Sequence, residues 1–121
     1  MAFYENQDSL SFEADSDLSD NQFHFMSSTT GDRVGLTGAG EYAIGVLQND
    51  PAAAGRAAQV AIDGKLQVKC GGAVTAGSPM ASDANGRAVN ATTGAIILGE
   101  ALEAGATGEV ITILFHPRGA A

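Results

Sequence analysis

Residues 59–70 read QVAIDGKLQVKC, two short runs rich in Val, Ile and Leu on either side of an Asp-Gly pair. Each run has the length and composition of a β-strand. Asp63 and Gly64 can supply the positive φ angles that a type I′ turn requires. The stretch therefore predicts a β-hairpin, with one strand at 59–62 and the other at 66–70.

The same pattern of short β segments and glycine-bearing turns continues on both sides of this hairpin. Residues 109–115 (EVITILF) predict the strongest strand, and residues 42–47 (YAIGVL) are a further candidate. By period alone residues 95–102 could be strand or helix, and Gly99 favours strand. At most one helical turn is expected, at 51–56. Strands roughly every 8–12 residues are typical of a sandwich or small barrel, so we expect an all-β fold, a compact β-barrel or sandwich.

The composition favours a protein that binds other protein surfaces. The 121 residues are enough for one domain rather than two. They include 16 Gly, no Trp, two Tyr and five Phe. Small side chains dominate the second half, and these fill thin layers between closely spaced strands. A domain built from them gains stability when it buries further area against a partner.

The net charge of −8 lies entirely in the first part of the chain. Residues 1–50 hold nine acidic residues and one basic residue, whereas residues 51–121 hold five of each. Nucleic-acid binding needs basic patches that face phosphate, so we expect no nucleic-acid partner. The acidic run either solubilises the protein or meets a basic patch on a partner.

The first 32 residues combine acidic charge with spaced aromatic residues, a pattern too apolar for a simple disordered tail. It predicts an extended, acidic N-terminal arm at 1–32, followed by a β-rich domain at 33–121. Residues 23–26 (FHFM) alternate and can form a strand in which His24 faces away from both Phe neighbours. We expect the arm to anchor through its rings on its own domain or on a neighbour. The predicted partner-binding residues are Phe3, Tyr4, Phe12, Phe23 and Phe25.

The residues that could carry catalysis or bind a metal are few and scattered. The local sequence places no nucleophile or orienting group beside His24, His116 or Cys70. Residues 15–20 (DSDLSD) are similar to calcium loops but lack the glycine and the terminal Glu of an EF-hand. Residues 38–43 (GAGEYA) fit a relaxed dinucleotide pattern without a convincing strand and helix around it. We therefore expect no catalytic residue, no metal, no cofactor and no enzyme activity.

The sequence also bears on the compartment. A single Cys excludes an intramolecular disulfide framework. No run approaches the roughly 20 apolar residues of a membrane span. The first ten residues lack the basic and apolar regions of a signal peptide. We expect synthesis in the cytoplasm and no membrane partner.

Four motifs follow one another in the second part of the chain. They are GVLQNDP at 45–51, VTAGSPMASDANGRAV at 74–89, ILGEAL at 97–102 and GEVI at 108–111. In this order and spacing, residues 41–115 resemble the small head-decoration, or capsid cement, proteins of tailed bacteriophages. The resemblance does not cover residues 1–40.

The resemblance implies an accessory virion protein without catalytic residues or a cofactor. Such proteins assemble, often as homotrimers, on the outer surface of the expanded capsid. There they bind the major capsid protein at junctions between capsomers and stabilise the shell. The implied partners are the major capsid protein and further copies of this chain. The alternative is a small β-barrel module that binds a ligand or a glycan, although small side chains and the lack of Trp argue against a roomy pocket or a sugar platform.

Overall fold

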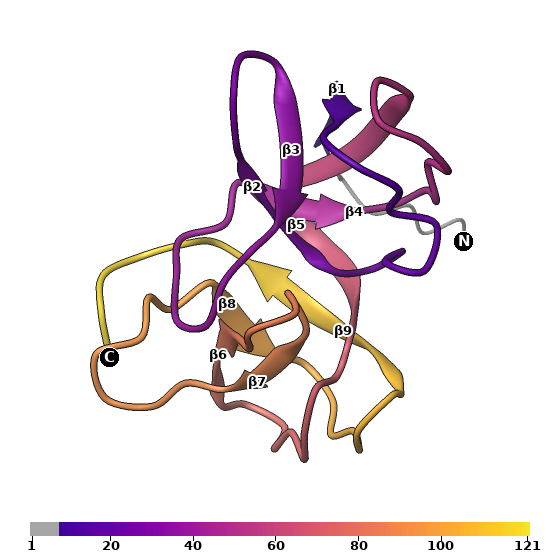
Figure 1. Ribbon diagram of the computed structural model, residues 1–121. Helices are drawn as coiled ribbons and strands as arrows, with labels where there is room; N and C mark the ends of the chain where they lie inside the picture. Colours follow the sequence, from indigo (N-terminus) through magenta and orange to yellow (C-terminus); the bar gives the residue numbers. More distant parts are fainter. Residues whose placement is uncertain (1–7) are drawn as a thin grey trace.

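The computed structural model describes residues 8–121, which form nine β-strands and no helix (Figure 1). The expected all-β fold is therefore confirmed. The strands are β1 (Asp8–Ala14), β2 (Phe25–Ser28), β3 (Arg33–Leu36), β4 (Gly45–Leu47), β5 (Ala57–Lys69), β6 (Pro79–Ser82), β7 (Ala88–Asn90), β8 (Gly99–Ala101) and β9 (Val110–Phe115).

The first five strands close a barrel. β1 pairs in parallel with β3 and antiparallel with β5, and antiparallel pairs join β3 to β2, β2 to β4 and β4 to β5. Because β1 contacts both β3 and β5, this sheet has no open edge. The barrel core consists of Ala14, Leu18, Met26, Val34, Leu47, Ala58 and Val60, with Phe12, Ile44 and Ile62 packed against it.

The hairpin predicted at residues 59–70 is wrong, because this stretch lies in one continuous strand. β5 runs for 13 residues through the Asp-Gly pair. Up to Asp63 it pairs with strands of the barrel, and from Gly64 onward it pairs with β9. Gly64 has a φ of +94°, so the positive φ expected of a turn instead redirects a continuing strand. Each of the two runs therefore pairs with strands from elsewhere in the chain, and the two runs do not pair with each other.

A second sheet is built on the other half of β5, in the order β5-β9-β8-β6-β7 (Figure 1). A parallel bridge between Cys70 and Ala88 brings β7 back to the end of β5. The two halves of the molecule therefore share a strand. The second core includes Leu66, Val68, Cys70, Val74, Met80, Leu98, Ile111, Ile113 and Phe115, and it extends onto Phe25, Val46 and Ala61 of the barrel wall.

The described part of the predicted arm consists of residues 8–32. It supplies β1 and β2, two of the five barrel strands. Glu13 aligns with Arg33 of β3 and with Ala57 of β5, so the segment is paired on both sides. At the end of β1 the acidic Glu13 is exposed and the next residue, Ala14, is buried, as expected for alternate residues of a strand. Phe3 and Tyr4 lie outside the described residues.

The remaining strand predictions hold in part. Residues 109–115 form β9, which begins one residue later than expected. The candidate at 42–47 is reduced to the three residues of β4, and that at 95–102 to the three residues of β8. The predicted helical turn at 51–56 is a non-helical turn in which the Arg56 N–H donates to the Ala53 carbonyl at 3.2 Å.

Candidate protein-binding surface

The predicted partner-binding aromatics lie in different environments. Phe25 is fully buried in the core between barrel and second sheet, where its ring centroid is 6.2 Å from that of Phe115. That position leaves no ring surface for a partner. Phe12 is half-buried and packs against the barrel core. Phe23 is half-buried and lines a hollow on the surface.

Phe23 has an unusual backbone. Its φ of +68° is the only positive value among the non-glycine residues in the range 8–121. For a bulky side chain this region of φ costs about 1–2 kcal/mol. Two hydrogen bonds hold the conformation: the Phe23 N–H donates to the Leu47 carbonyl at 2.7 Å, and the Phe23 carbonyl accepts from the Lys69 N–H at 2.8 Å. The fold therefore positions this ring despite the strain.

Two shallow hollows lie at the seam between the two halves: one of about 360 Å³ is lined by Phe23, and one of about 310 Å³ is lined by the neighbouring His24. They share Asp20 and Lys69, so they form one continuous surface with an acid and a base at its centre. We call this the seam surface. Its residues are Ser19, Asp20, Asn21, Gln22, Phe23, His24, Leu36, Lys69, Asn85, Arg87 and Val110.

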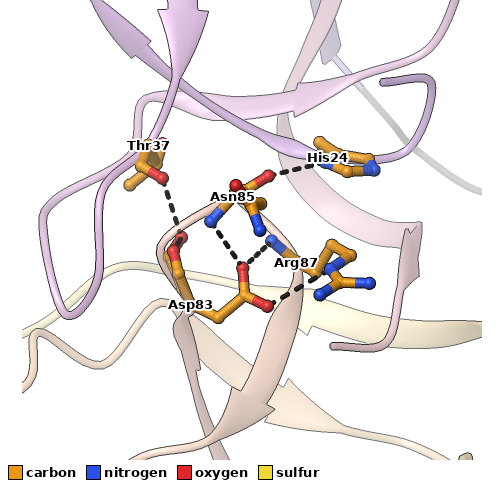
Figure 2. A network of polar contacts seen from close by, with 6 residues as sticks. His24, Thr37, Asp83, Asn85 and Arg87 are labelled. Atoms are coloured by element: carbon orange, nitrogen blue, oxygen red, sulfur yellow. Dashed lines mark hydrogen bonds and ion pairs between the residues drawn. The ribbon is translucent and has the colours of Figure 1, made fainter. Parts of the chain in front are cut away.

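A tight loop at residues 82–87 forms one wall of the seam surface (Figure 2). The Asp83 carboxylate accepts hydrogen bonds from the N–H groups of Asn85 and Arg87 at 2.9 and 2.8 Å, and it pairs with the Arg87 Nε at 3.2 Å. These contacts let one carboxylate organise the whole turn. The loop belongs to the SDANGR part of the motif noted at 74–89, so that motif has a structural role here.

The same loop is bonded directly to the barrel. The Phe25 N–H donates to the Gly86 carbonyl at 2.6 Å, and the Ser82 hydroxyl donates to the Thr37 carbonyl at 3.3 Å. His24 Nδ1 lies 2.7 Å from the Asn85 carbonyl oxygen (Figure 2). Burial, more than the nearby Lys69 and Arg87 charges, lowers the pKa of His24 below its usual value. The imidazole is therefore a neutral structural contact between the two halves.

The other two residues considered for catalysis have contacts of their own that do not include His24. Cys70 is buried at the end of β5, and burial raises the pKa of its thiol, which makes it a poor nucleophile. His116 is exposed after β9 and contacts Glu100 and Arg118. Among the described residues, neither histidine is hydrogen-bonded to a Ser, Thr or Cys.

The two weak ligand motifs also have local structural roles. Asp17 accepts the Ser19 N–H at 2.9 Å, and hydrogen bonding by Ser19 lowers the pKa of Asp17. Residues 38–43 connect β3 to β4, so no helix follows the glycines. Within residues 8–121 there is no group of three or more His, Cys, Asp or Glu that could hold a metal ion. In that same range no helix is long and apolar enough to cross a membrane.

Comparison with known proteins gives a family match and similar solved structures. The phage cement protein family matches residues 5–116. The structure of the N base of head fiber gp8.5 of bacteriophage phi29 is similar, with a TM-score of 0.77 and 19% sequence identity, over 95% of this chain and 98% of that one. A search of the curated proteins found no match.

The family match includes the motifs on which the resemblance rested and extends through the barrel strands β1 and β2. It thereby confirms the resemblance to capsid cement proteins. At 19% identity, the phi29 head fiber base supports the fold alone. The chain belongs to the phage cement protein family, and its role is that of a structural protein of the phage capsid.

Proposed function

We propose that this protein decorates and stabilises the capsid as a homotrimer bound to the outer surface of the major capsid protein shell, at junctions between capsomers. The family match over residues 5–116 is the observation that carries this proposal. The separate hydrogen-bond partners of His24 and His116, and the buried thiol of Cys70, agree with a binding role without catalysis. No step of the proposed function needs a cofactor.

The seam surface is the part of the described chain best suited to contact the shell. One hollow brings the half-buried Phe23 beside the exposed Val110, the other is lined by the exposed Leu36, and Asp20 and Lys69 line both. Complete burial of a Phe side chain contributes about 1.5–3 kcal/mol. Many identical contacts around a shell raise the overall affinity through avidity. Modest binding per copy is therefore sufficient for stable decoration. Phe3, Tyr4 and Phe12 stay predicted contacts of the same kind.

Co-sedimentation with expanded, undecorated capsids tests the proposal. The wild-type chain should pellet with the shells and saturate at a fixed ratio to the major capsid protein. Phe23→Ala should reduce binding at least about tenfold, as for an aromatic anchor at an interface. Tyr42→Ala is the matched control, because Tyr42 is 57% exposed but is not part of the seam surface. Wild-type protein that stays in the supernatant would overturn the proposal.

The alternative of a ligand or glycan module gains no support from a third hollow, on the second sheet. This groove has a volume of about 420 Å³ and is lined by small side chains of the loops around β6 and β7. It contains no aromatic ring on which a sugar could stack. The structure therefore favours a protein partner over a small ligand.

A further inference from the structure

The loop at residues 82–87, which walls the seam surface, contains an Asn-Gly pair, Asn85 and Gly86. Glycine has no Cβ, so its backbone nitrogen is less hindered than that of any other residue. The amide of an asparagine before glycine is therefore the most open to attack by the next backbone nitrogen. Within residues 8–121 a residue with a side chain follows each of the other asparagines, which are Asn21, Asn49 and Asn90.

The side-chain amide of Asn85 makes no hydrogen bond to the described residues. Asn85 is exposed, and its contacts come from the main chain. Its N–H donates to the Asp83 carboxylate at 2.9 Å, and its carbonyl oxygen lies 2.7 Å from His24 Nδ1 (Figure 2). The amide carbon, Cγ, can therefore turn toward the main chain without breaking a side-chain hydrogen bond.

Two of the other asparagines have amides that are held in place. The Asn49 amide donates to the Ala57 carbonyl at 3.0 Å and accepts the Gln59 N–H at 2.9 Å, so both of its ends are fixed. The Asn90 side-chain oxygen accepts the Thr75 N–H at 3.3 Å. Asn49 is therefore an internal standard for an asparagine whose amide cannot turn.

The backbone nitrogen of Gly86 is loosely held. Its N–H donates to the Asp83 carbonyl at 3.2 Å, and the Ser82 hydroxyl donates to the same oxygen at 2.8 Å. The Asp83 N–H, by comparison, donates to the Arg87 carbonyl at 2.8 Å. Ordinary N–H to O distances are about 2.9–3.0 Å. Little hydrogen-bond energy is therefore lost when the Gly86 nitrogen leaves its acceptor.

We infer that Asn85 deamidates spontaneously and that the product loosens the loop from the barrel. The Gly86 nitrogen gives its proton to solvent and forms a bond to Cγ of Asn85. The bond from Cγ to Nδ2 breaks, and ammonia leaves with a proton from solvent. Water then opens the resulting cyclic imide. Cleavage at Cγ yields aspartate, and cleavage at the former backbone carbonyl yields isoaspartate. The sum is a hydrolysis in which nothing is oxidised or reduced, and it does not depend on the proposed function.

Both products change the contacts between the loop and the barrel. Isoaspartate lengthens the main chain by a methylene group, and the Asn85 carbonyl that His24 contacts becomes a free carboxylate. The lengthened chain also displaces the Gly86 carbonyl, which accepts the Phe25 N–H at 2.6 Å. Aspartate keeps the main chain but adds a negative charge to a hollow that Asp20 already lines. Isoaspartate should therefore be the more disruptive product.

Peptide mapping by mass spectrometry tests the site, with the folded full chain incubated in mildly alkaline buffer. Asn85 should deamidate at least about tenfold faster than Asn49, with isoaspartate among the products. Asn85→Gln is the control and should abolish the fast reaction, because glutamine must close a larger ring. Equal rates at Asn85 and Asn49 would overturn the inference. So would an Asn85 that reacts in the urea-unfolded chain but stays intact in the folded one.

Thermal unfolding tests the consequence. The added charge allows ion-exchange chromatography to separate the modified chain from the intact one. The isoaspartate form should melt at least about 3 °C lower than the intact chain. Asn85→Asp carries the charge without the methylene group and should show a smaller decrease. An isoaspartate form with the wild-type melting temperature would contradict the loosening of the loop.

Capsid co-sedimentation separates this inference from the proposed function. An isoaspartate form that melts earlier but binds shells like the intact chain would leave the inference in place and overturn the assignment of the shell contact to the seam surface. Intact protein that does not bind shells would overturn decoration, while deamidation at Asn85 would still stand on the peptide map.

Discussion

The ring of Phe25 lies where the barrel and the second sheet meet, fully buried against Phe115. Phe25→Ala would leave a cavity shared by both halves and should lower the free energy of unfolding by about 3–5 kcal/mol. Phe12→Ala should cost less, since Phe12 is only half-buried. Urea denaturation measures both. Equal losses in the two variants would contradict the central position of Phe25.

His24 should make the stability depend on pH. Burial lowers its pKa below the usual 6.5, so the unfolded chain takes up the proton more readily than the folded one. Stability is then full above pH 6.5 and falls as the pH drops from there toward the lowered pKa. Hydrogen bonds also lower the pKa values of Asp17 and Glu100, but carboxylates act at lower pH, below 4.5.

Urea unfolding at pH 7.5, 6.5 and 5.5 measures this dependence. His24→Gln should flatten it, because a Gln amide can still donate to the Asn85 carbonyl without titrating in this range. An equally steep fall in His24→Gln would assign the dependence to other groups.

The difference between Phe23 and Phe25 was not readable from the sequence. Strict alternation places the two rings on the same face of a strand, yet β2 begins only at Phe25. The positive φ of Phe23 turns the chain just before that strand. Positive φ is expected of glycine and not of phenylalanine. The hydrogen bonds to Leu47 and Lys69 that hold this conformation come from distant parts of the chain, so the local sequence does not predict it. Phe23 was nonetheless predicted as a contact residue, whereas the Lys69 and Val110 beside it come from distant strands.

Among the elements, the loop at residues 82–87 should be sensitive to added bulk. Gly86 has a φ of +77°, and a Cβ there would lie 2.8 Å from the Phe25 carbonyl oxygen. Gly86→Ala should therefore cost about 1–3 kcal/mol, through both backbone strain and a clash with the barrel. Gly94→Ala is the control, since its φ is +91° with no atom within 4 Å of the added Cβ, so strain acts alone.

Thermal unfolding compares the two glycine variants. The extra loss of stability in Gly86→Ala, compared with that in Gly94→Ala, measures how tightly the loop is packed against the barrel. Identical losses would show that the clash relaxes at no cost and that the docking is loose.

The local alternation of apolar and polar residues predicted some strands correctly, but it did not predict which strands pair. β9 has clean alternation of buried and exposed residues, and its prediction was accurate to one residue. The Asp63-Gly64 pair carries equally strong turn chemistry, but each half of β5 found a partner from a distant part of the chain. Closure of the barrel by β1 likewise depends on pairing between distant strands, which a pattern of neighbouring residues cannot predict.

For the whole molecule, truncation tests whether residues 33–121 can fold without residues 1–32. Without β1 and β2, β3 loses both of its partners, and Val34, Leu47 and Val60 become exposed to water. We expect residues 33–121 alone to lose cooperative thermal unfolding. Deletion of residues 1–7 is the control and should retain it, because the described barrel begins at Asp8. A truncated chain with the wild-type melting temperature would instead support a dispensable arm.

The shared strand also has a mechanical consequence. β5 passes unbroken from one half to the other, so tension between the halves travels along a single extended backbone. Separating the halves lengthwise would require the hydrogen bonds of β5 to β1, β4 and β9 to slide in shear together rather than open one at a time. We therefore expect a protein of this design to yield to pulling in one abrupt step.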